Sequence, residues 1–222
     1  MYINLHQIKN ISMAHPIILG YEQTFEKNFP LIMIVGREPN TETMSKTDGS
    51  LGGIPFTDKG IDINGKPYNN QRCSFWNIAF GTFARYNQLN IREIKTLFVQ
   101  KKACPLIFTD ASPVAILNSV NNKNDIRKGI DELILKHVNM IFFKEEIIQR
   151  VKLIIFSGLQ NQVYNTFKTL FIERANKYAI HINADMPFFY GTNSEGIKNV
   201  IEQKDTDIID IFNSVYKEFV NS

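Results

Sequence analysis

Four short apolar runs, bounded by polar residues, glycine or proline, stand out along this chain of 222 residues. They cover residues 31–35, 105–109, 151–157 and 178–182. Runs of this length, rich in β-branched residues, are typical of parallel strands that are buried on both faces. The pattern therefore predicts four core strands.

Segments with helical spacing of apolar residues lie between and after these runs, at residues 74–86, 125–148, 161–175 and 194–220. One apolar face of the second segment consists of Ile130, Leu133, Ile134, His137, Val138 and Ile141. Strands that alternate with helices favour a mostly parallel sheet with helices on both faces. The chain shows no repeat, low-complexity tract or linker. We therefore predict an α/β fold, a single domain over residues 1–222, built as a three-layer α/β/α sandwich around about four strands.

The first run ends in a charged turn, with the sequence LIMIVGREPN at residues 31–40. Gly36 permits a tight exit from the strand, and Pro39 prevents its simple continuation. Glu38 is thus expected at the C-terminal end of a central strand, where open α/β sheets bind their ligands. This position makes Glu38 a candidate for chemistry. The alternative is a simple turn in which the carboxylate of Glu38 is solvated.

The composition describes a packed protein with only mild charge. Hydrophobic residues make up 44% of the chain, including 17 Phe, and the formal net charge is +3. This excess permits a local basic groove for an anionic partner without establishing one. The two cysteines, Cys73 and Cys104, are too few for a disulfide framework, a four-cysteine zinc site or an iron–sulfur cluster. They are expected to be buried thiols in a reducing compartment.

The first ten residues lack the pattern of a signal peptide, and no apolar run approaches the ~20 residues that span a bilayer. We therefore expect a cytoplasmic protein without a membrane partner. Residues 41–71 are rich in Gly, Asp, Asn, Ser and Thr and are expected to form a long loop. Long loops in compact domains are often functional. The alternative is a surface excursion with a short hairpin near Asn64-Gly65.

Six short motifs occur in a fixed order, and together they carry a family resemblance. The motifs are GREPN at 36–40, GIPF at 53–56, RCSFWNIAF at 72–80, FTDASP at 108–113, IIFSGLQNQVYNTF at 154–167 and MPFFYGTNS at 186–194. In this order they resemble the uracil-DNA glycosylase superfamily, over roughly residues 30–203. The pair Phe75-Trp76 and the FTDASP motif make the mismatch-specific uracil/thymine branch the most similar.

The resemblance implies an enzyme that flips a nucleotide out of duplex DNA and hydrolyses its N-glycosidic bond. It implies no metal and no organic cofactor. Glu38 stands where the family positions or activates the attacking water. The other residues that it implies for the substrate pocket are Gly36, Arg37, Pro39, Phe56, Asp110 and Tyr190. Those implied for DNA binding are Phe189, Gly191, Thr192 and Asn193.

Elementary chemistry agrees with these assignments. Cleavage of the bond develops positive charge on the sugar, which a carboxylate such as Glu38 can stabilise while it orients water. A flipped base loses stacking, which an aromatic ring such as Phe56 can restore. Phe56 could also be an ordinary core residue. Asp110, directly after the second run, could line the pocket or could cap a following helix.

Three departures from the family leave the function open. The last motif has Phe188 and Phe189 where the family usually has His or Asn before Pro-Ser. The side chain of Glu38 is one methylene longer than that of Asp or Asn. Residues 58–69 look like an insertion in the loop that follows the first motif. The first hypothesis is a monomeric DNA glycosylase for a mismatched, damaged or modified pyrimidine, such as a bulky base of phage DNA. The others are an inactive DNA- or nucleotide-binding module of the same fold, and an unrelated small-molecule α/β hydrolase or transferase.

Overall fold

The computed structural model of the chain describes residues 11–13, 17–36, 51–53, 83, 87–112, 114–116, 131–157, 159, 162–186 and 207–222. The strands are β1 (Ile11–Met13), β2 (Ile18–Gly20), β3 (Leu31–Gly36), β4 (Leu51–Gly53), β5 (Leu106–Asp110), β6 (Val114–Ile116), β7 (Val151–Ser157) and β8 (His181–Met186). The α-helices are α1 (Glu22–Glu26), α3 (Ile91–Lys101), α5 (Asp131–Phe142), α6 (Glu145–Ile148), α7 (Asn165–Ala175) and α9 (Asp207–Asn221). Two 3₁₀ turns, Gln162–Tyr164 and Asn176–Tyr178, flank α7.

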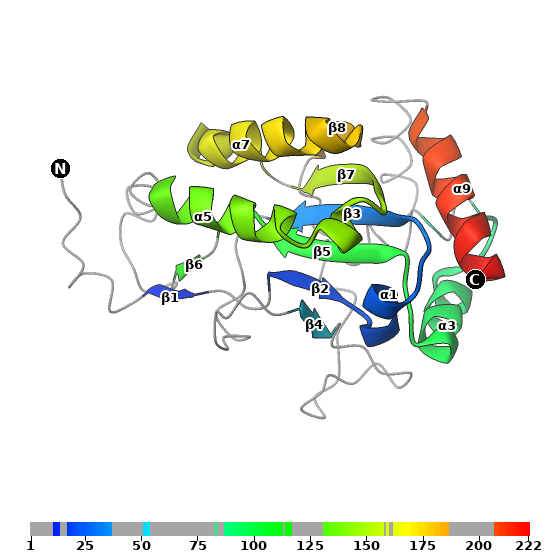
Figure 1. Cartoon of the computed structure of the whole chain (residues 1–222). Helices are drawn as coiled ribbons and strands as arrows, with labels where there is room; N and C mark the ends of the chain where they lie inside the picture. The colour runs from blue at the N-terminus through cyan, green and yellow to red at the C-terminus, as the bar shows by residue number, and fades with distance from the viewer. Residues whose placement is uncertain are drawn as a thin grey trace.

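The main sheet has six strands in the order β4-β2-β5-β3-β7-β8, so the described part of the chain is an α/β fold (Figure 1). The four longer strands β5, β3, β7 and β8 are mutually parallel and correspond to the four predicted runs. β2 joins β5 antiparallel through the single pair Leu19 and Phe108, and β4 pairs with β2 in parallel. A separate pair of strands, β1 and β6, is antiparallel.

The predicted sheet of about four strands lacked β2 and β4. Each of these strands has only three residues, too few to produce a recognisable hydrophobic pattern. β4 also lies inside residues 41–71, which were predicted to be a loop, so that prediction is wrong for Leu51–Gly53.

The fourth predicted run, residues 178–182, begins too early. Residues Asn176–Tyr178 form a 3₁₀ turn, and Ala179 follows in the left-handed conformation with φ of 52°. An L-residue adopts this conformation mainly at a turn, so the chain cannot be extended there. The strand therefore begins at His181.

The described helices differ from the predicted helical segments. The segment 125–148 contains two of them, α5 and α6, and the chain between them turns at Phe143 and Lys144. In the segment 194–220 the described helix is α9, from Asp207. Helix α3 begins with a reciprocal cap, in which the Asn90 side chain accepts from the Glu93 amide at 2.9 Å and Glu93 accepts from the Asn90 amide at 2.6 Å.

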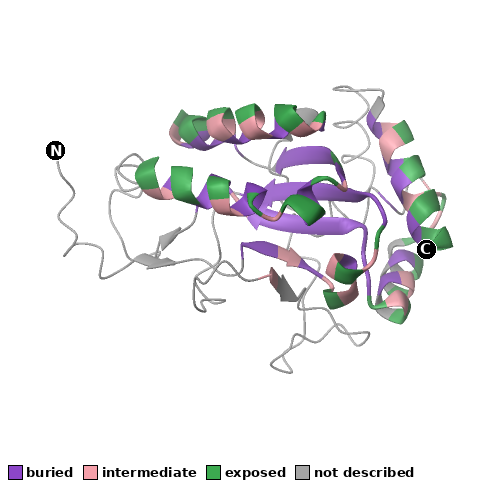
Figure 2. Ribbon diagram, viewed as in Figure 1, coloured by how far each residue is buried: buried purple, intermediate pink, exposed green. Residues whose placement is uncertain are grey.

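Aromatic rings join the helices to each other and to the sheet. Helices α5 and α7 run side by side (Figure 1), and the Phe171 ring of α7 meets Phe142 of α5 at 4.9 Å and Phe156 of β7 at 5.9 Å. Helix α9 contacts β3 and β7. Phe219 of α9 packs edge-to-face against Phe98 of α3 and against Phe29. All of these rings are buried, and Figure 2 shows the central strands of the sheet as buried too.

Strand β3 lies in the middle of this core. Each of its six residues is buried, and it pairs on one side with β5 and on the other with β7. The guanidinium of Arg150 helps to fix the chain before β3, because it donates to the carbonyls of Phe29 and Thr24 at 3.0 and 2.8 Å. Arg150 also lies 5.2 Å above the ring of Phe29, so a cation–π contact adds to these bonds.

The side chain of Thr24 in α1 forms hydrogen bonds with both backbone groups of Cys104 in the protein interior. Its hydroxyl donates to the Cys104 carbonyl at 3.0 Å and accepts from the Cys104 amide at 2.8 Å. Both residues are fully buried, so no solvent can replace these bonds.

Replacement of Thr24 by Val keeps the shape but removes both bonds. We expect Thr24→Val to lower the free energy of unfolding by about 2 kcal/mol, because buried backbone groups lose their partner. Urea denaturation measures this change. Thr24→Ser is the matched control, since it keeps the hydroxyl and should lose only the ~0.8 kcal/mol of one buried methyl group. A Val variant as stable as the native protein would contradict this account of the Thr24 hydroxyl.

Candidate functional site

The C-terminal ends of the four parallel strands define one edge of the sheet. Because β3, β5, β7 and β8 run in the same direction, Gly36, Asp110, Ser157 and Met186 all end strands at this edge. Four of the sequence motifs therefore include the last residue of one of these neighbouring strands: GREPN, FTDASP, IIFSGLQNQVYNTF and MPFFYGTNS. Open α/β sheets bind ligands outside this edge. It is thus the candidate site.

Gly36 and Asp110 are the two predicted site residues that the structure describes, and it brings them together. They are register partners at the end of the β3–β5 pair. The amide of Ala111 donates to the Gly36 carbonyl at 2.8 Å, so the ladder continues to the last residue of each strand. The points where the two motifs leave the sheet are consequently fixed relative to each other.

The other predicted site residues lie outside the described part of the chain. They are Arg37, Glu38, Pro39, Phe56, Phe189, Tyr190, Gly191, Thr192 and Asn193. The roles that the sequence predicted for them stay predictions. The two loops expected beside the pocket, residues 58–69 and most of 186–194, also lie outside the described residues.

Asp110 does not cap a helix, which corrects one of its two predicted roles. Residues Val114–Ile116, where the helix would begin, form strand β6. Asp110 is half-exposed, whereas the four preceding residues of β5 are buried. The neighbouring Thr109 is anchored through its hydroxyl, which donates to the Ile17 carbonyl at 2.7 Å. Asp110 is therefore the residue at which β5 reaches the edge of the core. Its other predicted place, beside a pocket, stays a prediction.

A buried histidine supports this strand end from the adjacent helix. His137 of α5 is 6% exposed, and its Nε2 lies 2.8 Å from the carbonyl oxygen of Asp110. A carbonyl only accepts hydrogen bonds, so Nε2 carries the proton and the imidazole is the donor. The ring also lies 6.4 Å from that of Phe167 in α7. His137 thus links α5 to the end of β5.

Sequence reasoning placed His137 on the apolar face of a helix but gave it no role. The sequence does contain a signal for such a role, because His137 is the polar member of the buried face of α5. The other buried residues of this helix are Ile134, Val138, Ile141 and Phe142. Its partner could not be found from the sequence, since the partner is a backbone carbonyl 27 residues away.

Burial keeps His137 neutral. Loss of solvent lowers the pKa of His137 from 6.5 to about 4, and the bond to the Asp110 carbonyl opposes this shift only in part. At neutral pH the ring therefore brings a hydrogen-bond donor to the strand end without bringing a positive charge.

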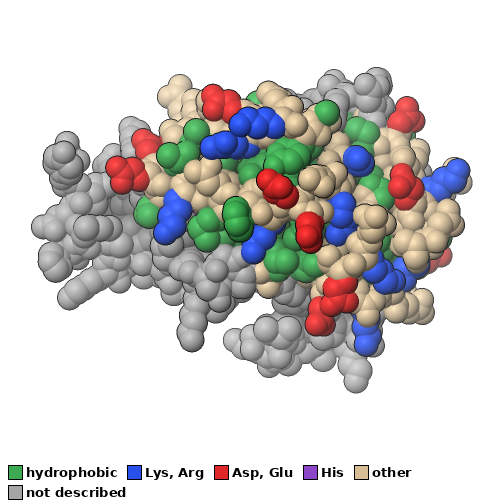
Figure 3. Space-filling view, in the orientation of Figure 1, with side chains coloured by type: hydrophobic (Ala, Val, Ile, Leu, Met, Phe, Trp, Pro, Cys, Tyr) green, Lys and Arg blue, Asp and Glu red, His purple; other side chains and the backbone are tan. Residues whose placement is uncertain are grey.

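The face of the molecule in Figure 3 does not carry a basic groove on its described residues. Lysine and arginine side chains alternate there with aspartate and glutamate. This face therefore carries charges of both signs on its described residues.

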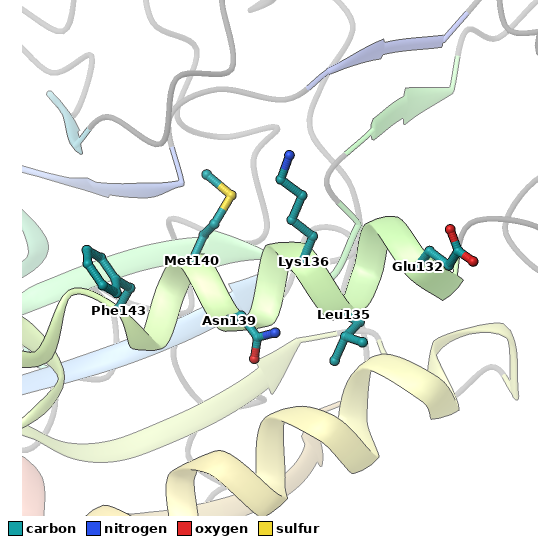
Figure 4. Close-up of a pocket in the computed structure, with 6 residues that line it drawn as sticks. All are labelled: Glu132, Leu135, Lys136, Asn139, Met140 and Phe143. Atoms are coloured by element: carbon teal, nitrogen blue, oxygen red, sulfur yellow. The ribbon is translucent and has the colours of Figure 1, made fainter.

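A depression of about 390 Å³ lies along α5, over residues other than those that the helix buries. It is lined by Glu132, Leu135, Lys136, Asn139, Met140 and Phe143 (Figure 4). All six residues belong to α5 or to the turn that follows it, and Asn139 accepts a hydrogen bond from Arg174 of α7 at 2.9 Å. None of the predicted site residues lines this depression.

Among the residues that the structure describes, no helix has the length and apolar character needed to cross a membrane. The same residues contain no group of three or more His, Cys, Asp or Glu side chains arranged to hold a metal ion. Comparison of the chain with protein-family models, with curated proteins and with solved structures finds no match. The glycosylase resemblance therefore stays a prediction from the motifs.

The buried state of His137 should make the stability of the protein depend on pH. Between pH 6.5 and about 4 the unfolded chain binds the proton and the folded protein does not. The contribution of His137 to the free energy of unfolding is therefore complete above pH 6.5 and is lost as the pH falls toward 4. We expect a loss of about 3 kcal/mol in the free energy of unfolding over this window.

Urea denaturation at a series of pH values, compared between the native protein and His137→Gln, measures this contribution. Glutamine keeps a donor but does not titrate, so the variant should lack this part of the pH dependence. Other groups that titrate contribute equally to both proteins and cancel in the difference. Parallel pH profiles for the two proteins would show that His137 is not the group responsible.

Proposed function

We propose that this chain is a DNA glycosylase that flips a mismatched, damaged or modified pyrimidine out of DNA and hydrolyses its N-glycosidic bond. The proposal includes a single domain built as a three-layer α/β/α sandwich. The protein would act as a cytoplasmic monomer and would need no metal or organic cofactor.

One observation carries the proposal: Gly36 and Asp110 are register partners at the C-terminal edge of the sheet. They belong to GREPN and FTDASP, two motifs far apart in the sequence. A glycosylase needs its water-directing group and its base-recognising groups around one nucleotide. Adjacent strand ends supply such an arrangement, and this supports the motif resemblance with a spatial relation that the sequence alone lacks.

The proposed mechanism divides the work between two residues. The carboxylate of Glu38 stabilises the positive charge that develops on the sugar and orients the water that attacks it. The ring of Phe56 stacks on the flipped base and offsets part of the few kcal/mol that unstacking costs. Negative charge on the departing base requires hydrogen-bond donors, which backbone amides or polar side chains at the strand ends would provide.

A binding module without catalysis is the second candidate. It is favoured by the absence of His or Asn before the Pro-Ser step that the family usually has, since MPFFYGTNS has aromatic residues there. Such a module would bind DNA or a nucleotide at the same strand edge. Detection of abasic sites in oligonucleotides separates the two functions directly.

Replacement of the proposed catalytic carboxylate tests the mechanism. Glu38→Gln should bind DNA as the native protein does but release base about 100-fold more slowly, because the lost charge acts mainly in the transition state. Single-turnover release measured by alkaline cleavage, beside a gel-shift assay, gives both quantities. Glu42→Gln removes the same charge four residues away and is the control. Undiminished release by Glu38→Gln would remove Glu38 from the catalytic role.

The substrate should be larger than uracil. The insertion at residues 58–69 and the aromatic loop at 186–194 would change the contacts to the exocyclic groups of the base, which decide selectivity. On a panel of duplexes that each carry one altered base, we expect a mismatched thymine or a 5-substituted pyrimidine, such as phage DNA contains, to be released faster than uracil. If uracil is released fastest, the selectivity argument fails although the glycosylase assignment survives.

A further inference from the structure

We propose that His137 is a positioning residue that holds Asp110 in the orientation needed to recognise the base, an inference that rests on the proposed glycosylase function. The argument depends on a single peptide unit at the end of β5. The structure describes both of its hydrogen-bonding groups.

The peptide that joins Asp110 to Ala111 is held from both sides. Its carbonyl oxygen lies 2.8 Å from Nε2 of His137 in α5. Its amide donates at 2.8 Å to the carbonyl of Gly36 in β3. These two bonds fix the plane of the peptide, and with it the backbone rotation that sets the direction of the Asp110 side chain.

The two hydrogen bonds matter for the proposed function because this peptide lies at the candidate site. Asp110 is the half-exposed last residue of β5, and its register partner Gly36 opens the motif that contains Glu38. Rotation of the peptide would therefore move the Asp110 carboxylate relative to the end of β3, where that motif leaves the sheet. Errors of about 1 Å in such positions cost large factors in rate.

Simple packing does not require an imidazole at position 137. The neighbouring buried residues of α5, Ile134, Val138 and Ile141, are aliphatic. A leucine would fill much of the same space without the cost of burying a polar ring. The histidine supplies what an aliphatic side chain lacks, a donor for the Asp110 carbonyl.

A double-mutant cycle tests this role through base release. His137→Leu should lower kcat/KM about 10- to 100-fold, and His137→Gln, which keeps a donor, should restore most of the loss. In an Asp110→Ala background, His137→Leu should cause no further loss, because there is no carboxylate left to position. A merely structural role would lower kcat/KM by the same factor in both backgrounds, and that result would overturn the proposal.

Amide hydrogen exchange tests the same claim without requiring activity. His137→Leu should accelerate exchange of the Ala111 amide about tenfold more than exchange of the Ile32 amide, which donates to the Pro105 carbonyl at 2.8 Å at the other end of the same strand pair. Equal effects on the two amides, or none, would overturn the positioning role.

The two measurements separate failure of this inference from failure of the proposed function. If the native protein releases no base from any duplex, the glycosylase proposal fails, and the exchange result alone decides whether His137 holds the peptide. If the native protein is active and the cycle is additive, the glycosylase proposal stands and the positioning role of His137 is wrong.

Discussion

The pairing of β3 with a parallel strand on each side is the constraint on which the rest of the structure depends. All six residues of β3 are buried, so its backbone groups have no access to water and must be satisfied by β5 and β7. Parallel pairing then brings the C-terminal ends of these strands to one edge. The location of the candidate site follows from this requirement, because each of the sequence motifs at this edge includes the residue at which its strand ends.

The strand edge is held by polar contacts from outside the sheet. Thr109 reaches the carbonyl of Ile17, and His137 reaches the carbonyl of Asp110. Two successive residues of β5 are thus held by hydrogen bonds next to the point where the strand leaves the core: the Thr109 hydroxyl donates one, and the Asp110 carbonyl accepts the other. At the opposite end of the sheet, Arg150 plays a similar part for the chain that enters β3. Rigid support of this kind is what a site needs if it must hold reacting groups in fixed geometry.

The longer strands could be predicted from the sequence because they are buried and therefore continuously apolar. The three-residue strands β2 and β4 could not be, since so few residues show no period. The start of β8 was misplaced because apolar residues 178–180 lie in a turn around Ala179, whose left-handed backbone has no signature in an alanine. Hydrophobicity identifies which residues are buried, but the backbone conformation decides whether they belong to a strand.

The candidate site could likewise be predicted from the sequence only in part. The position of Gly36 at a strand end could be predicted, because a buried run stops there. The pairing of Gly36 with Asp110 needed the strand order, which depends on contacts between distant segments. The role of His137 was hidden for a related reason, since it binds a backbone carbonyl, and any residue type can provide one.

The central claim is that DNA binds at the edge where β3 and β5 end. Hydrogen exchange with and without a duplex that carries a 2′-fluorinated target nucleotide, which resists hydrolysis, tests this location directly. The account predicts slower exchange on DNA binding in peptides that cover residues 36–41 and 108–113. Protection confined to the depression along α5, or no protection in either strand-end peptide, would contradict it.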